Sequence, residues 1–237
     1  MNDYTELELI EKLKLIKEMG YVKTHRAGNT GIGKTLEDLL EINENNLSIS
    51  NGTDTELKSA RKNTSSMLTL FTKSPLPQKA NSILLKKFGY ESRRGNKKKE
   101  LHTTVNAIKH NQLKGQPGFK IDIKKDRINL QSNQNEILGY WDKETLKTSF
   151  ERKLPELLYV KADTIDKGAN EKFWFNEAWL LRDFDFNSFL NLIREGVILV
   201  DIRLGQYPNG KPHDHGTAFR VLPDKLELCF EYRERII

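Results

Sequence analysis

The chain has 237 residues, 30% of them charged, and a formal net charge of +6. This length suits one or two domains with a sizeable core. The excess of Lys and Arg favours a polyanionic partner, nucleic acid first, although a basic domain without such a partner is about as compatible. A single cysteine, Cys229, excludes an internal disulfide and a C-x-x-C zinc site. Because no apolar run reaches bilayer length and the first residues lack a signal-peptide pattern, we expect a cytoplasmic protein with no membrane contact.

The first part of the chain alternates helical and strand patterns. Apolar residues at helical spacing over residues 7–19 predict a helix that ends at Gly20. A polar, glycine-rich loop follows over residues 21–33, and Thr35 is the predicted N-cap of a second helix through TLEDLLEI. β-branched and aromatic residues predict strands over 55–59 and 67–73, and QKANSILLKKFG predicts a helix that ends at Gly89.

A basic loop, ESRRGNKKKE at residues 91–100, is the candidate boundary between two lobes. Beyond it, residues 119–131 alternate with a period of two on either side of Lys125-Asp126, which predicts a hairpin. Helices are predicted over 143–153 and 186–194, and strands over 157–162, 173–181, 197–204, 216–221 and 228–232. Helices and strands mixed without a regular βα alternation predict an α+β or mixed α/β fold.

The segment GNTGIGKT, Gly28 to Thr35, fits the phosphate-loop pattern G-x-x-x-x-G-K-[ST]. The run VILVD, which ends at Asp201, has the look of a magnesium-holding partner strand. A phosphate loop must follow a buried strand, however, and the preceding YVKTHRA has only Tyr21 and Val22 as large apolar residues. This weakly apolar segment makes an NTPase the less favoured hypothesis but does not exclude it.

A second constellation suggests nuclease chemistry. Glu56 and Lys58 lie two residues apart on an expected strand, so both side chains point to the same face. A carboxylate that holds Mg²⁺ beside a Lys that positions the attacking water is what metal-dependent phosphodiester hydrolysis requires. This E-x-K pattern alone is weak, because it occurs by chance in most charged proteins, but Asn51 and Asp54 stand just upstream in a turn. Glu37, on the preceding helix, is the candidate for a further carboxylate, with Asp38 and Glu41 as rivals on the same helix.

Longer motifs identify a family. The segments RAGNTGIGKTLEDLLEI, ELKSARK, SSMLTLFTKSP and VDIRLGQYPNGKPHDHGTAFR, in this order from about Arg26 to Arg220, closely resemble the MvaI/BcnI family of type II restriction endonucleases. That family is related to the mismatch-repair nickase MutH. The resemblance implies a PD-(D/E)xK nuclease core, a mixed sheet flanked by helices, with two lobes around a DNA cleft. It also implies that residues 1–92 are mainly the catalytic lobe, that residues 93–237 are mainly the DNA-recognition lobe, and that the glycine loop binds no nucleotide.

The resemblance also assigns catalytic residues. It implies that Glu37, Glu56 and Lys58 are catalytic, with Glu37, Glu56 and position 51 as Mg²⁺ ligands. Position 51 is Asn here, where the family has Asp. The chain is then an inactivated variant, a natural enzyme with a weaker site in which Asp54 takes over, or a chain whose correct alignment differs by a small loop change. Lys73 matches a family Lys near the scissile phosphate, and a simple phosphate contact is an equal alternative.

Base recognition is assigned to the second lobe. The residues implied to face the major groove are Asp201, Arg203, His213, His215 and Arg220. Tyr207 and, from the first lobe, Thr72 are further candidates for base recognition. Arg pairs with the edge of guanine and Asp accepts from the cytosine amine, which suits a site built of C and G. The basic loop at residues 93–99 and residues 109–114 are expected to contact phosphates, which adds affinity without sequence information.

The expected target is double-stranded DNA at CCWGG. Family members that read CCSGG carry His after the LTLF run, whereas those that read CCWGG carry Thr, as Thr72 does here. The resemblance further implies a monomer that cuts one strand at a time, and a DNA methyltransferase in the same restriction system. The alternative is a nickase or a sequence-specific DNA-binding protein that Asn51 has weakened or disabled as a nuclease.

Overall fold

The computed structural model describes residues 4–42, 47–48, 54–92, 98–154, 156–207 and 209–237. The chain divides into two compact units, each with its own sheets. Unit 1 comprises residues 1–66, 154–184 and 223–237, and unit 2 comprises residues 67–153 and 185–222. Each unit combines segments from both halves of the chain, because strands from the second half complete the sheet of unit 1. Among the described residues, no helix has the length and apolar character needed to cross a membrane.

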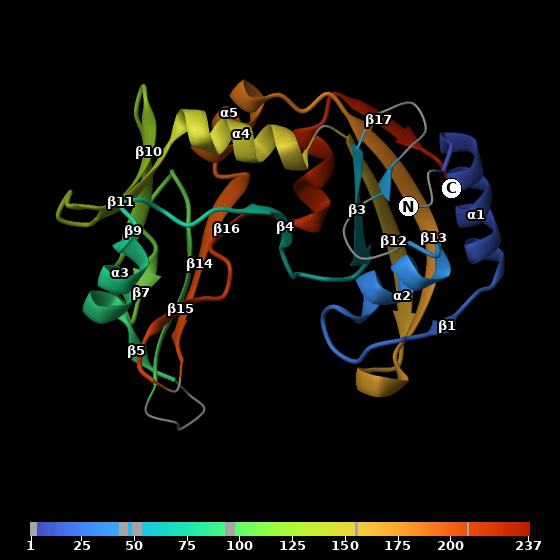
Figure 1. Ribbon diagram of the computed structural model, residues 1–237, viewed down its shortest axis with the longest axis horizontal. Helices are drawn as coiled ribbons and strands as arrows, with labels where there is room; N and C mark the ends of the chain where they lie inside the picture. Colours follow the sequence, from blue (N-terminus) through green and yellow to red (C-terminus); the bar gives the residue numbers. More distant parts are fainter. Residues whose placement is uncertain (1–3, 43–46, 49–53, 93–97, 155, 208) are drawn as a thin grey trace. The chain divides into compact units, whose positions relative to one another are not determined.

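Unit 1 is built on a mixed sheet whose strand order is β1-β13-β12-β3-β2, with β17 also paired to β13 (Figure 1). The long strands β3 and β12 run parallel, with Thr55 opposite Glu156, whereas β12 and β13 are antiparallel. Its elements are α1 (Glu6–Glu18), β1 (Val22–Lys23), α2 (Gly31–Leu39), β2 (Leu47–Ser48), β3 (Asp54–Arg61), β12 (Glu156–Ile165), the 3-10 turn η1 (Gly168–Asn170), β13 (Lys172–Arg182), the 3-10 helix η2 (Pro223–Cys229) and β17 (Tyr232–Arg235).

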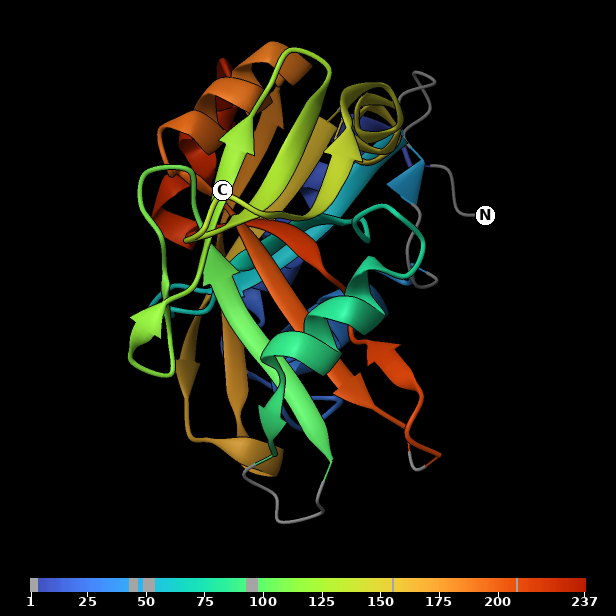
Figure 2. The same cartoon turned by 90° about the vertical axis from the view of Figure 1, so that its left-hand side faces the viewer.

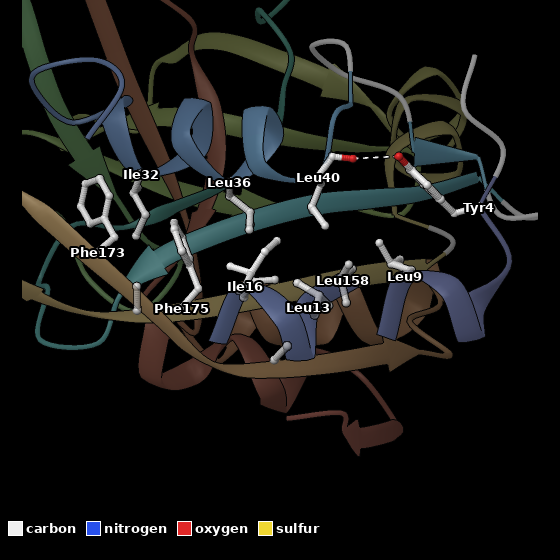
Figure 3. Packing of buried hydrophobic residues seen from close by; sticks show 13 residues of the cluster. Tyr4, Leu9, Leu13, Ile16, Ile32, Leu36, Leu40, Leu158, Phe173 and Phe175 are labelled. Atoms are coloured by element: carbon white, nitrogen blue, oxygen red, sulfur yellow. Dashed lines mark hydrogen bonds between the residues drawn. The ribbon is translucent and has the colours of Figure 1, made fainter. Parts of the chain in front are cut away.

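Both helices of unit 1 pack on one face of this sheet. Figure 3 shows Ile32, Leu36 and Leu40 of α2 pointing toward the side chains of α1, which include Leu13 and Ile16. These residues are at most 4% exposed. Burial of this amphipathic face stabilises α2 more than helix propensity does, since an isolated helix of this length is marginal in water.

Unit 2 contains a sheet of order β4-β16-β14-β6-β5, with β15 on β14, and a three-stranded sheet β11-β10-β9. The helix α3 contacts β6 and β14, as Figure 2 shows. Its elements are β4 (Leu68–Thr72), α3 (Ala80–Phe88), β5 (Tyr90–Glu91), β6 (Lys99–Val105), β7 (Gln112–Leu113), β8 (Gln116–Pro117), β9 (Phe119–Ile123), β10 (Arg127–Ser132), β11 (Ile137–Asp142), α4 (Lys143–Lys153), α5 (Phe186–Arg194), β14 (Ile198–Gln206), β15 (Pro212–Asp214) and β16 (Ala218–Val221).

Aromatic side chains dominate the core of unit 2. The ring centroid of Phe71 lies 5.1 Å from that of Phe219 and 5.6 Å from that of Phe189, and Phe150 completes the group at 5.2 Å from Phe189. Such pairs add about 0.5 to 1.5 kcal/mol each beyond the burial of their area. They join β4, β16, α4 and α5, which are separated in the sequence, into one core.

The mixed α+β class is confirmed, and two of the segments where the structure differs from the sequence predictions have a physical explanation. The helix predicted to be capped by Thr35 begins earlier, at Gly31, and Thr35 lies inside it. Only glycine fits at the first helical position, since Gly31 lies against the carbonyl of Arg26. A Cβ at that position would lie 2.1 Å from the Arg26 oxygen. Residues 228–232 were expected to be a closing strand, but a 3-10 helix runs from Pro223 to Cys229 and the strand begins only at Tyr232. Pro at the start of this segment favours a helical first turn.

Candidate functional site

The glycine loop of residues 28–35 does not have the arrangement of a phosphate loop. The strand before it, β1, is a two-residue strand paired antiparallel to β13, not a strand inside a parallel sheet. The Thr35 hydroxyl, which would face a metal in a phosphate loop, is buried, donates to the Gly31 carbonyl at 2.8 Å and accepts from the His25 amide at 3.0 Å. The loop instead leads into α2 and fixes where that helix starts.

The strand β3 carries the E-x-K pair. Leu57 packs against the core beneath α1 and α2, so Glu56 and Lys58 on either side of it point to the opposite face. The Nζ of Lys58 donates to Oε1 of Glu56 at 3.2 Å, and the two side chains are 14% and 26% exposed. The structure therefore brings together a carboxylate and an ammonium group that are partly shielded and still reachable from solvent.

The helix α2 runs alongside β3 in the opposite direction. Arg61, at the end of β3, donates to the Gly28 carbonyl at 3.3 Å, while Gly33 lies over Ser59, with 3.8 Å between an ideal Cβ and the Ser59 hydroxyl. Glu37 follows Gly33 by one helical turn on the same side of the helix. It therefore lies at the level of the first half of β3, on the α2 side of the sheet, whereas Glu56 and Lys58 point to the opposite face.

Two other acidic residues of this segment have partners elsewhere. The Oδ2 of Asp38 lies 2.8 Å from Nδ1 of His25, and Oε2 of Glu41 lies 2.9 Å from Nζ of Lys12. Both contacts tie α2 to neighbouring structure.

A buried carboxylate that the sequence analysis missed anchors the start of β3. Glu156 is 4% exposed and accepts a hydrogen bond from the Thr55 hydroxyl at 2.6 Å. Its other oxygen accepts from Nε of Arg182, whose NH2 group donates to Glu6 at 2.9 Å. Thr55 directly precedes Glu56, so this network fixes the backbone that carries the functional carboxylate.

The described oxygen donors fit a magnesium ion of the kind that keeps most of its waters. In the part of the chain that the structure describes, no three His, Cys, Asp or Glu side chains form a metal-binding group. Mg²⁺ is commonly held by one or two carboxylates together with substrate phosphates, so the partly exposed carboxylate of Glu56 is a suitable ligand. Asn51 and the side chain of Asp54 lie outside the described residues.

The recognition candidates of unit 2 converge on one carboxylate. Asp201, on β14, is 2% exposed, and its Oδ2 accepts from Nε of Arg203 at 2.7 Å. Nε of Arg220, on β16, lies 3.0 Å from the same oxygen, but its N–H does not point along a hydrogen-bonding direction, so this is a charge contact. Oδ1 accepts from the Thr104 hydroxyl at 3.1 Å. This cluster holds two guanidinium groups on one sheet face, and Thr104 is a member that sequence reasoning missed.

Aromatic rings continue from this cluster. The ring centroids of Tyr207 and His213 are 4.3 Å apart, those of His213 and His215 are 4.2 Å apart, and His102 lies 6.3 Å from His215. Gly205 permits this arrangement, since a Cβ there would lie 2.5 Å from Nε2 of His215. The structure thus brings together the three ring-bearing candidates and adds His102 to them.

The last two candidates of unit 2 lie around β4. Thr72 is exposed at the end of β4, and its Cγ2 would lie 3.4 Å from a Cβ at Gly216, next to His215. Lys73 follows, with its amide donating to the Thr217 carbonyl at 2.9 Å and its carbonyl accepting from Nε1 of Trp141 at 2.9 Å. The backbone at these positions is therefore fixed by both neighbouring segments.

The remaining candidates are basic segments and the cysteine. Residues 93–97 of the basic loop lie outside the described residues, whereas Lys109 and Lys114 are exposed. Nζ of Lys114 lies 5.0 Å from the ring centroid of Tyr90. Burial raises the pKa of the Cys229 thiol to about 12, so this thiol is not a nucleophile near neutral pH.

Comparisons with known proteins give a family match over most of the chain. The model of the MvaI/BcnI restriction endonuclease family matches residues 10–230. A solved structure described as the restriction endonuclease MvaI–cognate DNA substrate complex is 35% identical with a TM-score of 0.81, and the match covers 100% of both chains. MvaI in the absence of DNA is 32% identical with a TM-score of 0.58, again with 100% of both chains covered. A search of curated proteins found no match.

Proposed function

The chain belongs to the MvaI/BcnI restriction endonuclease family and is a site-specific DNA-cleaving enzyme, and we propose that it hydrolyses DNA at CCWGG with Mg²⁺, one strand at a time, as a monomer. We further propose that it acts in the cytoplasm, in a system with a DNA methyltransferase that protects the same sequence. The full-length similarity to MvaI on its cognate DNA supports DNA as the partner. The observation that carries the proposed chemistry is the Glu56–Lys58 pair on β3.

The proposed reaction is attack of water on phosphorus, with the P–O bond to the leaving oxygen breaking and a proton passing to that oxygen. Glu56 and Glu37, with residue 51, would hold Mg²⁺, which when bound neutralises charge on the phosphate and lowers the pKa of water. The Lys58 ammonium donates hydrogen bonds, so it orients the attacking water and stabilises charge that develops on the phosphate oxygens. The contact from Glu56 keeps that ammonium beside the reacting phosphate.

Recognition is proposed for the polar face of unit 2. The guanidinium groups of Arg203 and Arg220 are donors suited to the O6 and N7 edge of guanine. Asp201, expected to accept from the cytosine amine, is 2% exposed and is proposed instead to hold these two groups in place. The exposed Thr72 is proposed to distinguish the central W from S, which rests on the family pattern after the LTLF run. His213 and His215 extend the same face with further donors and acceptors.

The test is a time course on a supercoiled plasmid that carries one CCWGG site, compared with a plasmid that carries one CCSGG site. We expect Mg²⁺-dependent nicked circles before linear DNA on the first plasmid, and no change on the second. Lys58→Ala lowers the rate on the order of 10²- to 10⁴-fold while DNA binding persists. Lys87→Ala, which removes an exposed ion pair with Glu136, is the matched control and leaves the rate unchanged.

The substitution Asn51→Asp distinguishes an active endonuclease from a DNA-binding protein that recognises the site without cutting it. If the chain binds CCWGG but cuts only as the Asn51→Asp variant, it is a DNA-binding protein in its present form. If both forms cut, an amide oxygen suffices at this position or Asp54 replaces it. If Lys58→Ala cuts as fast as the unmodified chain, the assignment of the E-x-K pair is wrong.

A further inference from the structure

A second row of polar side chains lies beside the Asp201–Arg203 row. Antiparallel pairing of β14 with β6 places Thr104 opposite Asp201 and His102 opposite Arg203, so these four side chains share one face. Leu101 on β6 points the other way and is fully buried. The sequence contains no motif for this second row, because it exists only through pairing between strands about a hundred residues apart in the chain.

The two rows meet at the Asp201 carboxylate, and each oxygen has a different partner. Arg203 and Arg220 both contact Oδ2, at 2.7 and 3.0 Å. Two contacts to one oxygen fix its position but not the rotation of the carboxylate, whose terminal torsion has a broad energy minimum. The hydrogen bond from the Thr104 hydroxyl to Oδ1, at 3.1 Å, supplies the second point that defines the plane.

Electrostatics make this second anchor important. Burial lowers the pKa of Arg220, the Asp201 carboxylate opposes this, and the nearby positive charge of Arg203 lowers it further. The two guanidinium groups therefore repel each other across the carboxylate that holds them. Rotation of the carboxylate would move both donors relative to the DNA bases they face.

We propose that Thr104 is a positioning residue for sequence discrimination, which orients Asp201 and, through it, Arg203 and Arg220. The inference rests on the proposed recognition role of this cluster. Thr104 fixes which oxygen of this buried carboxylate holds the two guanidinium groups, and therefore where their donors point. Discrimination at C·G base pairs then depends on a hydroxyl that reads no base itself.

The variant Thr104→Val removes the hydroxyl and keeps the shape of the side chain, and Thr104→Ser restores the hydroxyl. Thr103→Val is the matched control, because Thr103 is the neighbouring Thr on the opposite face, where its hydroxyl accepts from Asn111 at 2.7 Å. Thr104→Ala provides a second variant without the hydroxyl, should the Val variant fold poorly. Thermal unfolding of each variant reports any loss of stability separately.

The readout is competition binding without added metal, which is independent of catalysis. The preferred site is first selected by the unmodified chain from a randomised duplex pool; selection of a site other than CCWGG refutes the proposed specificity, and the Thr104 test continues on the selected site. Discrimination is the ratio of the affinity for the selected site to the affinity for a duplex in which one C·G pair is substituted. We expect Thr104→Val and Thr104→Ala to lower this ratio by about tenfold. The salt dependence of binding to unrelated DNA should not change, because phosphate contacts are unaffected.

The control variants decide between positioning and general stability. We expect Thr104→Ser and Thr103→Val to discriminate as the unmodified chain does, even if Thr103→Val lowers the unfolding temperature. The proposal is overturned if Thr104→Val keeps full discrimination, or if Thr103→Val loses as much. It is also overturned if discrimination falls only in proportion to stability across the four variants.

Discussion

Asp214 is predicted to be essential for the loop that presents the histidines. Its Oδ1 accepts from the amides of Gly216 and Thr217 at 2.8 and 2.7 Å, and its Oδ2 accepts from Ser74 and Asn81, both at 2.7 Å. Asp214→Ala leaves two partly buried amides without this acceptor, at about 1 to 3 kcal/mol each. Water on the exposed side offsets part of this loss, so we expect a cost of about 3 kcal/mol. Asp214→Asn keeps an acceptor oxygen and should cost about 1 to 2 kcal/mol, because only the charge-assisted part is lost.

The assay is thermal unfolding followed by circular dichroism, together with plasmid cleavage. For a chain of this size, 1 kcal/mol corresponds to roughly 2 to 4 °C in Tm, so Asp214→Ala should lower Tm by roughly 6 to 12 °C. Cleavage at the cognate site should fall even well below that Tm, because His213 and His215 lose their fixed positions. Asp126→Ala, at an exposed residue in the turn between β9 and β10, should change neither quantity. If Asp214→Ala unfolds and cleaves like Asp126→Ala, the argument that Asp214 organises the loop is wrong.

Three further predictions follow from packing and charge. Gly205→Ala places a Cβ where Nε2 of His215 now lies, so we expect cognate cleavage to fall by roughly tenfold with little change in Tm, measured on one preparation. Burial opposes ionisation of Glu177, but hydrogen bonds from Trp179 and Lys161 lower its pKa to about 2, so its stabilising effect is present above pH 4.5 and lost as the pH falls toward 2. Glu177→Gln should therefore be less stable than the unmodified chain at pH 7 and equally stable near pH 2 in urea titrations, and equal stability at pH 7 would contradict this. Leu36→Ala, at a fully buried position, should cost about 2 to 5 kcal/mol in the same titration, and a cost below 1 kcal/mol would show that the core beneath α2 is not packed as described.

Helices and hairpins could be predicted from the sequence because their determinants are local. Residues 143–153 and 186–194 form helices with the expected bounds, the second capped by Asp185, whose carboxylate accepts from the Asn187 and Ser188 amides. The hairpin on either side of Lys125-Asp126 is present as β9 and β10. In these segments apolar periodicity and end signals agree with the tertiary packing, so neither overrides the other.

Strand partners could not be predicted, because they depend on contacts between distant segments. No local pattern in the sequence indicates that β3 pairs with β12, or that β14 pairs with β6. Each pairing joins segments about a hundred residues apart, and a shift of one residue would turn every side chain to the other face. For the same reason the sequence analysis missed Glu156 and Thr104, the two residues that hold the candidate sites from a neighbouring strand.

The two candidate sites share one structural principle, which explains why one part of each was predictable. In β3, Glu56 and Lys58 flank Leu57, and in β14, Asp201 and Arg203 flank the buried Ile202. The apolar residue anchors the strand in a core, and the period of two then fixes the charged pair on the opposite face. Spacing along one strand is visible in a sequence, so it indicates the Glu56–Lys58 pair, whereas Asp201 and Arg203 are assigned by the family resemblance. The hydrogen bond that orients each pair comes from another strand, as Thr55 to Glu156 and Thr104 to Asp201 show, and only the fold supplies it.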